Sequence, residues 1–171
     1  MVAIVAALAA AWVAVILLAP WLPVPVAGVV YLLGGRLCHQ IAERSFHLDG
    51  AQLPVCARCL GVYVGAVVGF TYACGASLTP GSPSRLRDGV ASSPGVNPRG
   101  SRHRDVLLGA LALNGVTMIL ESTGVWAASN AVRATVGAVL GVAVALAIGT
   151  VDYEQWPSPR RITSALPDSH I

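Results

Sequence analysis

Residues 132–151 read VRATVGAVLGVAVALAIGTV, an almost unbroken run of apolar and small residues. Its single charged side chain is Arg133, at the second position of the run. A helix needs about 20 mostly apolar residues to cross a bilayer. The stretch therefore predicts a membrane-spanning helix.

Three further runs are also mostly apolar and of similar length. They lie at residues 2–19, 60–78 and 106–122. The whole chain has 171 residues, of which 55% are hydrophobic and 11% are charged, whereas soluble domains carry about 25% charged residues. A soluble protein of this size could not bury so much apolar surface. The sequence predicts an all-α integral membrane protein, a bundle of about four transmembrane helices that forms one domain over residues 1–151.

A fifth apolar stretch, Val26–Leu33, is too short to span a bilayer alone. It predicts a short re-entrant or interfacial helix before the second full span. The first run stops at Pro20, and Trp21 follows as an anchor at the membrane interface. No residue before Ala19 is charged, so we expect a retained helix rather than a secretory signal.

Arginines are distributed unevenly between the two sides of the predicted bundle, and no lysine is present, a usage typical of GC-rich bacterial genomes. One side has Arg85, Arg87, Arg99, Arg102, Arg104, Arg160 and Arg161, and the other has Arg36, Arg44, Arg58 and Arg133. Positive charge marks the cytoplasmic side. We expect a multi-pass protein of the plasma membrane with both termini in the cytoplasm. The net charge of +3 requires no nucleic-acid partner.

Two segments have the composition of connecting regions. Residues 77–104 are rich in Pro, Gly, Ser and Arg, which predicts a flexible basic linker in the cytoplasm. Residues 152–171 contain three prolines and little periodicity, which predicts a disordered cytoplasmic tail.

The polar residues concentrate in residues 34–65, on the side predicted to face outward. Three of the four cysteines and two of the four histidines fall there, namely Cys38, His39, His47, Cys56 and Cys59. Because a membrane protein retains few such groups, this segment is the candidate functional site.

The order of these residues resembles a known family, the prokaryotic integral membrane proteins called domain of unknown function 2085. The resemblance rests on Cys38-His39-Gln40, Arg44-Ser45-Phe46, Gly50, Pro54, Cys56-Ala57-Arg58-Cys59, Gly61, Tyr63 and Gly65, and more weakly on Ser129, Asn130, Arg133, Gly137 and Gly141. This chain has Asn114 where many members carry Asp. The resemblance implies a membrane protein and supplies no reaction.

A metal site is the first interpretation of the cysteines. Cys-x-x-Cys places two thiols within reach of one ion, and Cys38 with His39 would complete a Cys₃His set. His47 and Glu121 are alternative ligands. Such a set favours zinc among the transition metals, in a carrier or sensor of the ion.

Two other interpretations remain open, so the sequence does not decide whether the protein is an enzyme. Cys56-x-x-Cys59 precedes a predicted helix and faces an oxidising compartment, as in membrane thiol-disulfide oxidoreductases. Alternatively, a disulfide from Cys38 to Cys56 or Cys59 would only pin the loop to the bundle.

Polar residues also recur in the third span. Asn114, Thr117 and Glu121 are spaced to share one helix face, and we expect an ion pair between Glu121 and Arg133. The residues expected to support the site are Gln40, Arg44, Ser45, Arg58, Tyr63, Asn114, Asn130 and Arg133.

Small residues form two rows with a spacing of four. One row is Gly61, Gly65 and Gly69, and the other is Gly137, Gly141, Ala145 and Gly149. Such rows allow helices to approach closely in lipid. They predict packing within the bundle and leave a homo-oligomer open.

Overall fold

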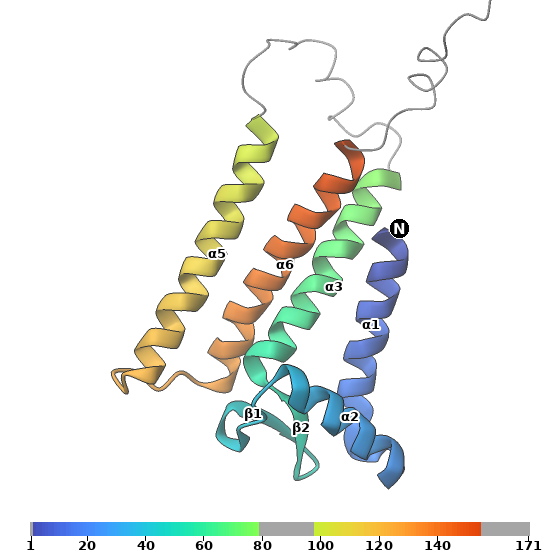
Figure 1. The fold of residues 1–171 in the computed structure, drawn as a ribbon, viewed down its shortest axis with the longest axis vertical. Helices are drawn as coiled ribbons and strands as arrows, with labels where there is room; N and C mark the ends of the chain where they lie inside the picture. The colour runs from blue at the N-terminus through green and yellow to red at the C-terminus, as the bar shows by residue number, and fades with distance from the viewer. Residues whose placement is uncertain (1, 79–97, 155–171) are drawn as a thin grey trace, which may run out of the picture.

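The computed structural model describes residues 2–78 and 98–154, and most of them are helical (Figure 1). Within these residues, four helices are long and apolar enough to cross a membrane. The candidate spans are Val2–Trp21, Ala57–Gly75, Arg104–Ser122 and Asn130–Gly149. The prediction of an all-α membrane protein with four spans is therefore confirmed.

The helices extend beyond some of the predicted bounds. They are α1 (Val2–Leu18), α3 (Ala57–Leu78), α5 (Pro98–Ser122) and α6 (Asn130–Glu154). Helix α5 begins inside the stretch predicted as a linker, because proline is well tolerated at the first position of a helix. The rest of the predicted linker, and the tail beyond residue 154, lie outside the described residues.

The four long helices stand side by side in the order α5, α6, α3, α1 (Figure 1). Helices α3 and α6 run parallel, and both begin at the end of the molecule that carries the strands. Helices α1 and α5 run in the opposite direction and pack against α3 and α6, respectively. The start of α1 therefore lies at the end away from the strands.

Glycines set the distance between α3 and α6. A Cβ atom added to Gly61 would overlap the carbonyl oxygen of Ala134, and one added to Gly65 would overlap that of Ala138. In the other direction, a Cβ atom on Gly141 would overlap the carbonyl oxygen of Val62. The two small-residue rows thus face each other within one chain, where close backbone contact stabilises the pair.

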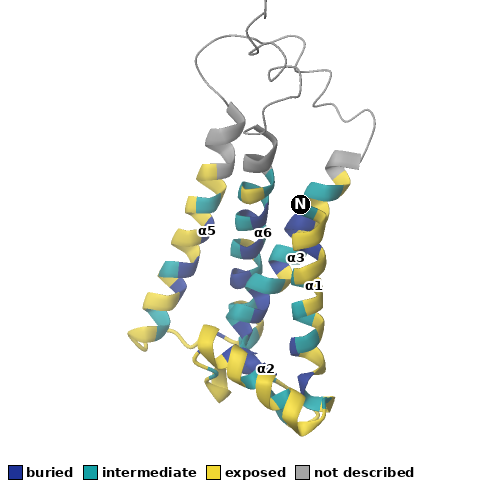
Figure 2. Ribbon diagram, turned by 45° about the vertical axis from the view of Figure 1, so that its right-hand side comes forward, coloured by how far each residue is buried: buried dark blue, intermediate teal, exposed yellow. Residues whose placement is uncertain are grey.

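A short helix, α2 (Val24–Leu37), lies across the lower end of the bundle (Figure 2). The turn η1 (Ala19–Trp21) joins it to α1, and Trp21 donates a hydrogen bond from Nε1 to Asp49 over 3.1 Å. This helix confirms the expected short helical element before the second full span.

The segment after α2 contains a small sheet that the sequence did not predict. It contains the turn η2 (Ala42–Arg44) and an antiparallel hairpin of β1 (Ser45–Leu48) and β2 (Ala51–Cys56). Asp49 and Gly50 form its two-residue turn with φ values of 50° and 80°. Asp-Gly favours such a turn because both positions need positive φ.

The hairpin covers an apolar cluster at the base of α1 and α3. Ile16, Leu53 and Val55 are at most 1% exposed, and Cys38 and Leu60 join them. By contrast, α5 exposes much of its surface (Figure 2), including Leu111, Val116 and Ile119. Exposed apolar side chains on a spanning helix suit contact with lipid.

Candidate functional site

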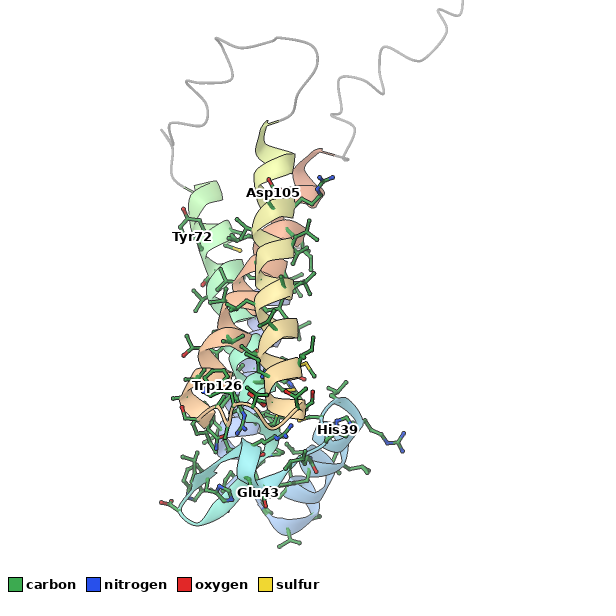
Figure 3. The ribbon with its side chains drawn as sticks, turned by 90° about the vertical axis from the view of Figure 1, so that its left-hand side faces the viewer. His39, Glu43, Tyr72, Asp105 and Trp126 are labelled. Atoms are coloured by element: carbon green, nitrogen blue, oxygen red, sulfur yellow. The ribbon has the colours of Figure 1, made fainter. Side chains whose placement is uncertain are left out.

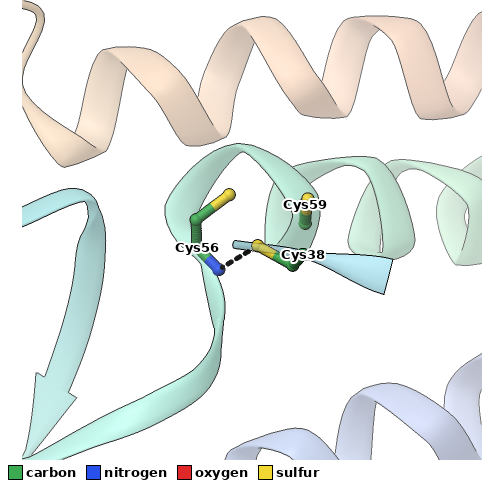
Figure 4. A group of neighbouring side chains, drawn as sticks. All are labelled: Cys38, Cys56 and Cys59. Carbon is green, nitrogen blue, oxygen red and sulfur yellow. Dashed lines mark hydrogen bonds between the residues drawn. The ribbon is translucent and has the colours of Figure 1, made fainter. Parts of the chain in front are cut away.

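Three cysteines converge where α2, β2 and α3 meet. Cys38 follows α2 in an extended conformation, Cys56 ends β2, and Cys59 lies in the first turn of α3. Their Sγ atoms all lie within 4.8 Å of one another (Figure 4). The fold therefore brings two separate parts of the motif into one thiol cluster.

Hydrogen bonds to sulfur favour the thiolate form of Cys56. The thiol of Cys59 bonds to the Cys56 sulfur, and this bond is the main cause that lowers the pKa of Cys56 to about 5. Partial burial opposes the shift, and backbone N–H groups of Cys59 and Arg58 support it. The Cys56 N–H itself donates to Sγ of Cys38 over 3.2 Å. Because the thiolate is both the nucleophile and the metal ligand, Cys56 is prepared for either chemistry.

Gln40 holds the end of α2 against β2. Its Nε2 donates to the carbonyl oxygen of Tyr31 over 2.7 Å and to that of Pro54 over 2.8 Å. The backbone carbonyl oxygen of Gln40 accepts a hydrogen bond from Nε2 of Gln52 over 2.7 Å. Backbone groups on both sides of Cys38 are thus fixed by side-chain amides, so the thiol cluster is held in place without a bond between sulfurs.

Glu121 joins three helices beside the cysteines. Its Oε1 accepts a hydrogen bond from Arg58 over 3.0 Å, and its Oε2 accepts one from Arg133 over 3.2 Å. The carboxylate side chain is only 4% exposed, so both ion pairs are shielded from solvent. The predicted pair between Glu121 and Arg133 is present, and Arg58 is a second partner that the sequence did not reveal.

A polar face continues from Glu121 along α5. Thr117 accepts a hydrogen bond from Arg58 over 3.4 Å, and Asn114 donates from Nδ2 to the carbonyl oxygen of Val136 over 3.0 Å. Asn114 and Thr117 are both buried. The spacing that predicted one shared face is confirmed, and this face contacts α6 and the start of α3.

Side chains of α6 attach the hairpin to the bundle. Asn130 donates from Nδ2 to the carbonyl oxygen of Ser45 over 3.0 Å. Arg133 donates to Asn130 over 2.9 Å and to the carbonyl oxygen of Glu43 over 3.4 Å. Tyr63 instead packs edge-on against Trp12, with ring centroids 6.4 Å apart. Asn130 and Arg133 therefore attach the hairpin and the preceding turn η2 to α6, and Tyr63 packs α3 against α1.

A cavity of about 250 Å³ lies beside the thiol cluster. His39 is exposed on its wall, at the same end of the molecule as Glu43 (Figure 3), whereas His47 lies on β1 and does not line it. The cavity is lined by Leu37, Cys38, His39, Gln40, Ile41, Arg44, Cys56, Arg58, Cys59, Met118, Glu121 and Arg133.

The thiol cluster fits the dimensions of a transition-metal site. Zinc binds thiolate sulfur at about 2.3 Å, which places two sulfurs of a tetrahedral site about 3.8 Å apart. The three Sγ atoms lie within 4.8 Å of one another, close to that spacing. Neither histidine belongs to the cluster, and both oxygens of Glu121 are engaged by arginines. The three cysteines could thus supply three ligands to one ion, and no fourth ligand belongs to the cluster among the described residues.

Comparison with known proteins gives one family and two relatives. An uncharacterized protein of Methanocaldococcus jannaschii is 45% identical over 40 residues, which cover 23% of this chain and 26% of that protein. An uncharacterized protein of Methanothermobacter thermautotrophicus is 49% identical over 37 residues, which cover 22% of this chain and 33% of that protein. Each alignment therefore spans a third or less of the relative.

No solved structure matches the chain. The sequence profile of a family described as "Predicted membrane protein (DUF2085)" matches residues 38–147, well over half of the chain. The match begins at the first cysteine of the cluster and includes α3, α5 and α6 as far as Ala147. The chain belongs to this family of membrane proteins, domain of unknown function 2085.

Proposed function

We propose that the protein binds one transition-metal ion through Cys38, Cys56 and Cys59, and that it carries or senses this ion at the membrane. The observation that supports this function is the convergence of three sulfur atoms within 4.8 Å. Thiolates are soft ligands that favour zinc and similar metals over magnesium or calcium. Zinc is the first candidate.

The number of thiols favours an exchangeable ion over a structural one. Structural zinc sites have four protein ligands, whereas sites that keep a position for another ligand have three. The cavity beside the cluster gives an incoming ligand access to that position. His39 lines this cavity, so its imidazole is the protein group best placed to become a fourth ligand. A carrier or sensor needs such a site, because it must release its ion.

Metal analysis of the full chain, purified in detergent without chelators, tests the proposal. We expect about one zinc per chain in the wild type and loss of the ion in Cys38→Ser, Cys56→Ser and Cys59→Ser. Cys74→Ser is the matched control, because Cys74 lies 15 residues along α3 from Cys59, about 22 Å away. A wild-type protein without bound metal, with all three thiols free to react, would contradict the proposal.

A second candidate is a membrane thiol-disulfide oxidoreductase, and the low pKa of Cys56 favours it. In this reaction a substrate dithiol is oxidised to a disulfide as the Cys56–Cys59 disulfide is reduced to two thiols. A lipid quinone then takes two electrons and two protons from Cys56 and Cys59 and becomes a quinol. This function requires Cys56 and Cys59 and tolerates Cys38→Ser, whereas metal binding requires all three cysteines. A permanent disulfide to Cys38 would instead indicate a structural role.

We further propose that the site faces outward in the plasma membrane and that both termini are cytoplasmic. The charge distribution in the sequence supports this orientation, because seven of the eleven arginines belong to the segment between the second and third predicted spans or follow the fourth. Labelling of Ser92→Cys by a membrane-impermeant thiol reagent in intact cells would contradict it. A homo-oligomer would need a surface other than the glycine rows, since these are buried between α3 and α6.

A further inference from the structure

We infer that the cavity beside the thiol cluster binds a small monocarboxylate with a short apolar chain. The inference rests on the proposed function and deepens it, because it names the class of ligand that enters the same cavity.

The charges around the cavity do not balance. Three guanidinium groups, those of Arg44, Arg58 and Arg133, share its wall with the single carboxylate of Glu121. A divalent ion with three thiolates carries one negative charge, which together with Glu121 balances Arg58 and Arg133, so the positive charge of Arg44 remains. Arg58 and Arg133 are largely buried, with side chains 16% and 12% exposed. Arg44 is exposed and forms no ion pair with a described residue, so the net positive charge of the cavity attracts a monoanion.

Guanidinium donors that could bind this monoanion are available on the cavity wall. Arg58 uses only Nη2 toward the described residues, so its Nη1 has no partner among them. The guanidinium of Arg44 forms no hydrogen bond or ion pair with any residue in the described ranges. The planar fork of arginine matches the two oxygens of a carboxylate better than it matches a spherical anion.

Most of the remaining wall of the cavity is apolar. Leu37, Ile41 and Met118 contribute to it, and all three are substantially exposed. A volume of about 250 Å³ is slightly below the range of about 300–1,000 Å³ that is usual for small-molecule pockets. The ligand is therefore small, with its carboxylate toward the arginines and a short alkyl chain against these side chains.

Calorimetric titration of the zinc-loaded full chain in detergent tests the inference with acetate, hexanoate and the neutral amide hexanamide. We expect one hexanoate per chain, bound at least tenfold more tightly than hexanamide. Binding of acetate as well as hexanoate would identify a soluble carboxylate, and binding of hexanoate alone would identify a membrane amphiphile. Absence of binding by both acids, or equal binding of hexanamide, would overturn the inference.

Two arginine variants locate the ligand. Arg44→Gln should weaken hexanoate binding at least fivefold. Because the Arg44 side chain is exposed, the thermal unfolding curve of the variant, measured in parallel, should match that of the wild type. Arg36→Gln is the matched control, because Arg36 is exposed at the same end but does not line the cavity. Equal affinities of Arg44→Gln and wild type would overturn the inference.

The metal content of each sample separates the two proposals. Hexanoate binding that depends on Arg44 in a protein that retains no zinc would contradict the metal site and support the carboxylate site. Stoichiometric zinc in a protein that binds neither acid would support the metal site and contradict the carboxylate site.

Discussion

Helix α6 contacts its two neighbours in different ways. Toward α3 it presents small residues, and the backbones approach so closely that a Cβ atom on Gly65 would overlap a carbonyl oxygen. Toward α5 it contributes the carbonyl oxygen of Val136 and the side chain of Arg133, which bond to Asn114 and Glu121. One contact is close packing along the helices, and the other is a set of polar bonds.

The difference explains how the site is built. The parallel pair α3 and α6 is a rigid support that fixes the start of α3, where Cys59 lies. Helix α5 is attached most strongly at its last turn, where Glu121 bonds to both members of that pair. Since Glu121, Arg58 and Arg133 also line the cavity, the attachment of α5 and the chemistry of the site depend on the same three side chains.

Loss of the carboxylate should have the largest effect on this arrangement. Glu121→Gln leaves the buried guanidinium groups of Arg58 and Arg133 without their counter-charge, and breaking a buried ion pair from one side costs about 3–5 kcal/mol. We expect the free energy of unfolding in detergent to fall by this amount. Thermal or denaturant unfolding followed by tryptophan fluorescence measures the change.

Glu43→Gln is the matched control for this variant. Glu43 lies at the same end of the molecule, and its exposed side chain makes no ion pair with a described residue. Its contact with Arg133 uses the backbone carbonyl, which the substitution keeps. Equal stabilities of the two variants would show that the ion pairs of Glu121 do not hold α5.

The close packing of α3 on α6 should respond to one added methyl group. In Gly65→Ala the new Cβ overlaps the backbone of Ala138, which cannot rotate away, so the helices must separate. Overpacking of this kind costs about 1–3 kcal/mol. The same unfolding measurement should report a loss within that range.

Gly115→Ala on α5 provides the comparison. A Cβ atom at Gly115 meets nothing within 4 Å, so the variant should be as stable as the wild type or up to about 1 kcal/mol more stable. If Gly65→Ala and Gly115→Ala lower the free energy of unfolding by the same amount, α3 does not pack more closely on α6 than α5 does.

The membrane spans were predictable because a bilayer imposes both a length and an apolar composition on a helix. The same constraint made the cysteines conspicuous, since a membrane protein retains few reactive groups without a reason. The glycine rows could be predicted as packing surfaces. Their spacing alone could not decide between contact within one chain and contact between two copies.

The hairpin and the second partner of Glu121 were not predictable in the same way. Asp49-Gly50 is a hairpin signal, but the flanking strands have only four and six residues, and Pro54 interrupts the second. Arg58 meets Glu121 across 63 residues of sequence. Helix periodicity describes one helix at a time, so it contains no information on which face of α5 meets the start of α3.

The smallest expected effect concerns Asn114, in the middle of the polar contact. Asn114→Leu removes the hydrogen bond to Val136, and bonds of this kind between membrane helices contribute about 0.6 kcal/mol on average. Thr71→Val is the control, since Thr71 is exposed and bonds only to carbonyl groups of its own helix, at Val67 and Val68. Unfolding of both variants should show a small loss for Asn114→Leu and none for Thr71→Val. A loss as large as that of Glu121→Gln would mean that α5 is held along its length rather than at its end, and the link between its attachment and the cysteine site would be lost.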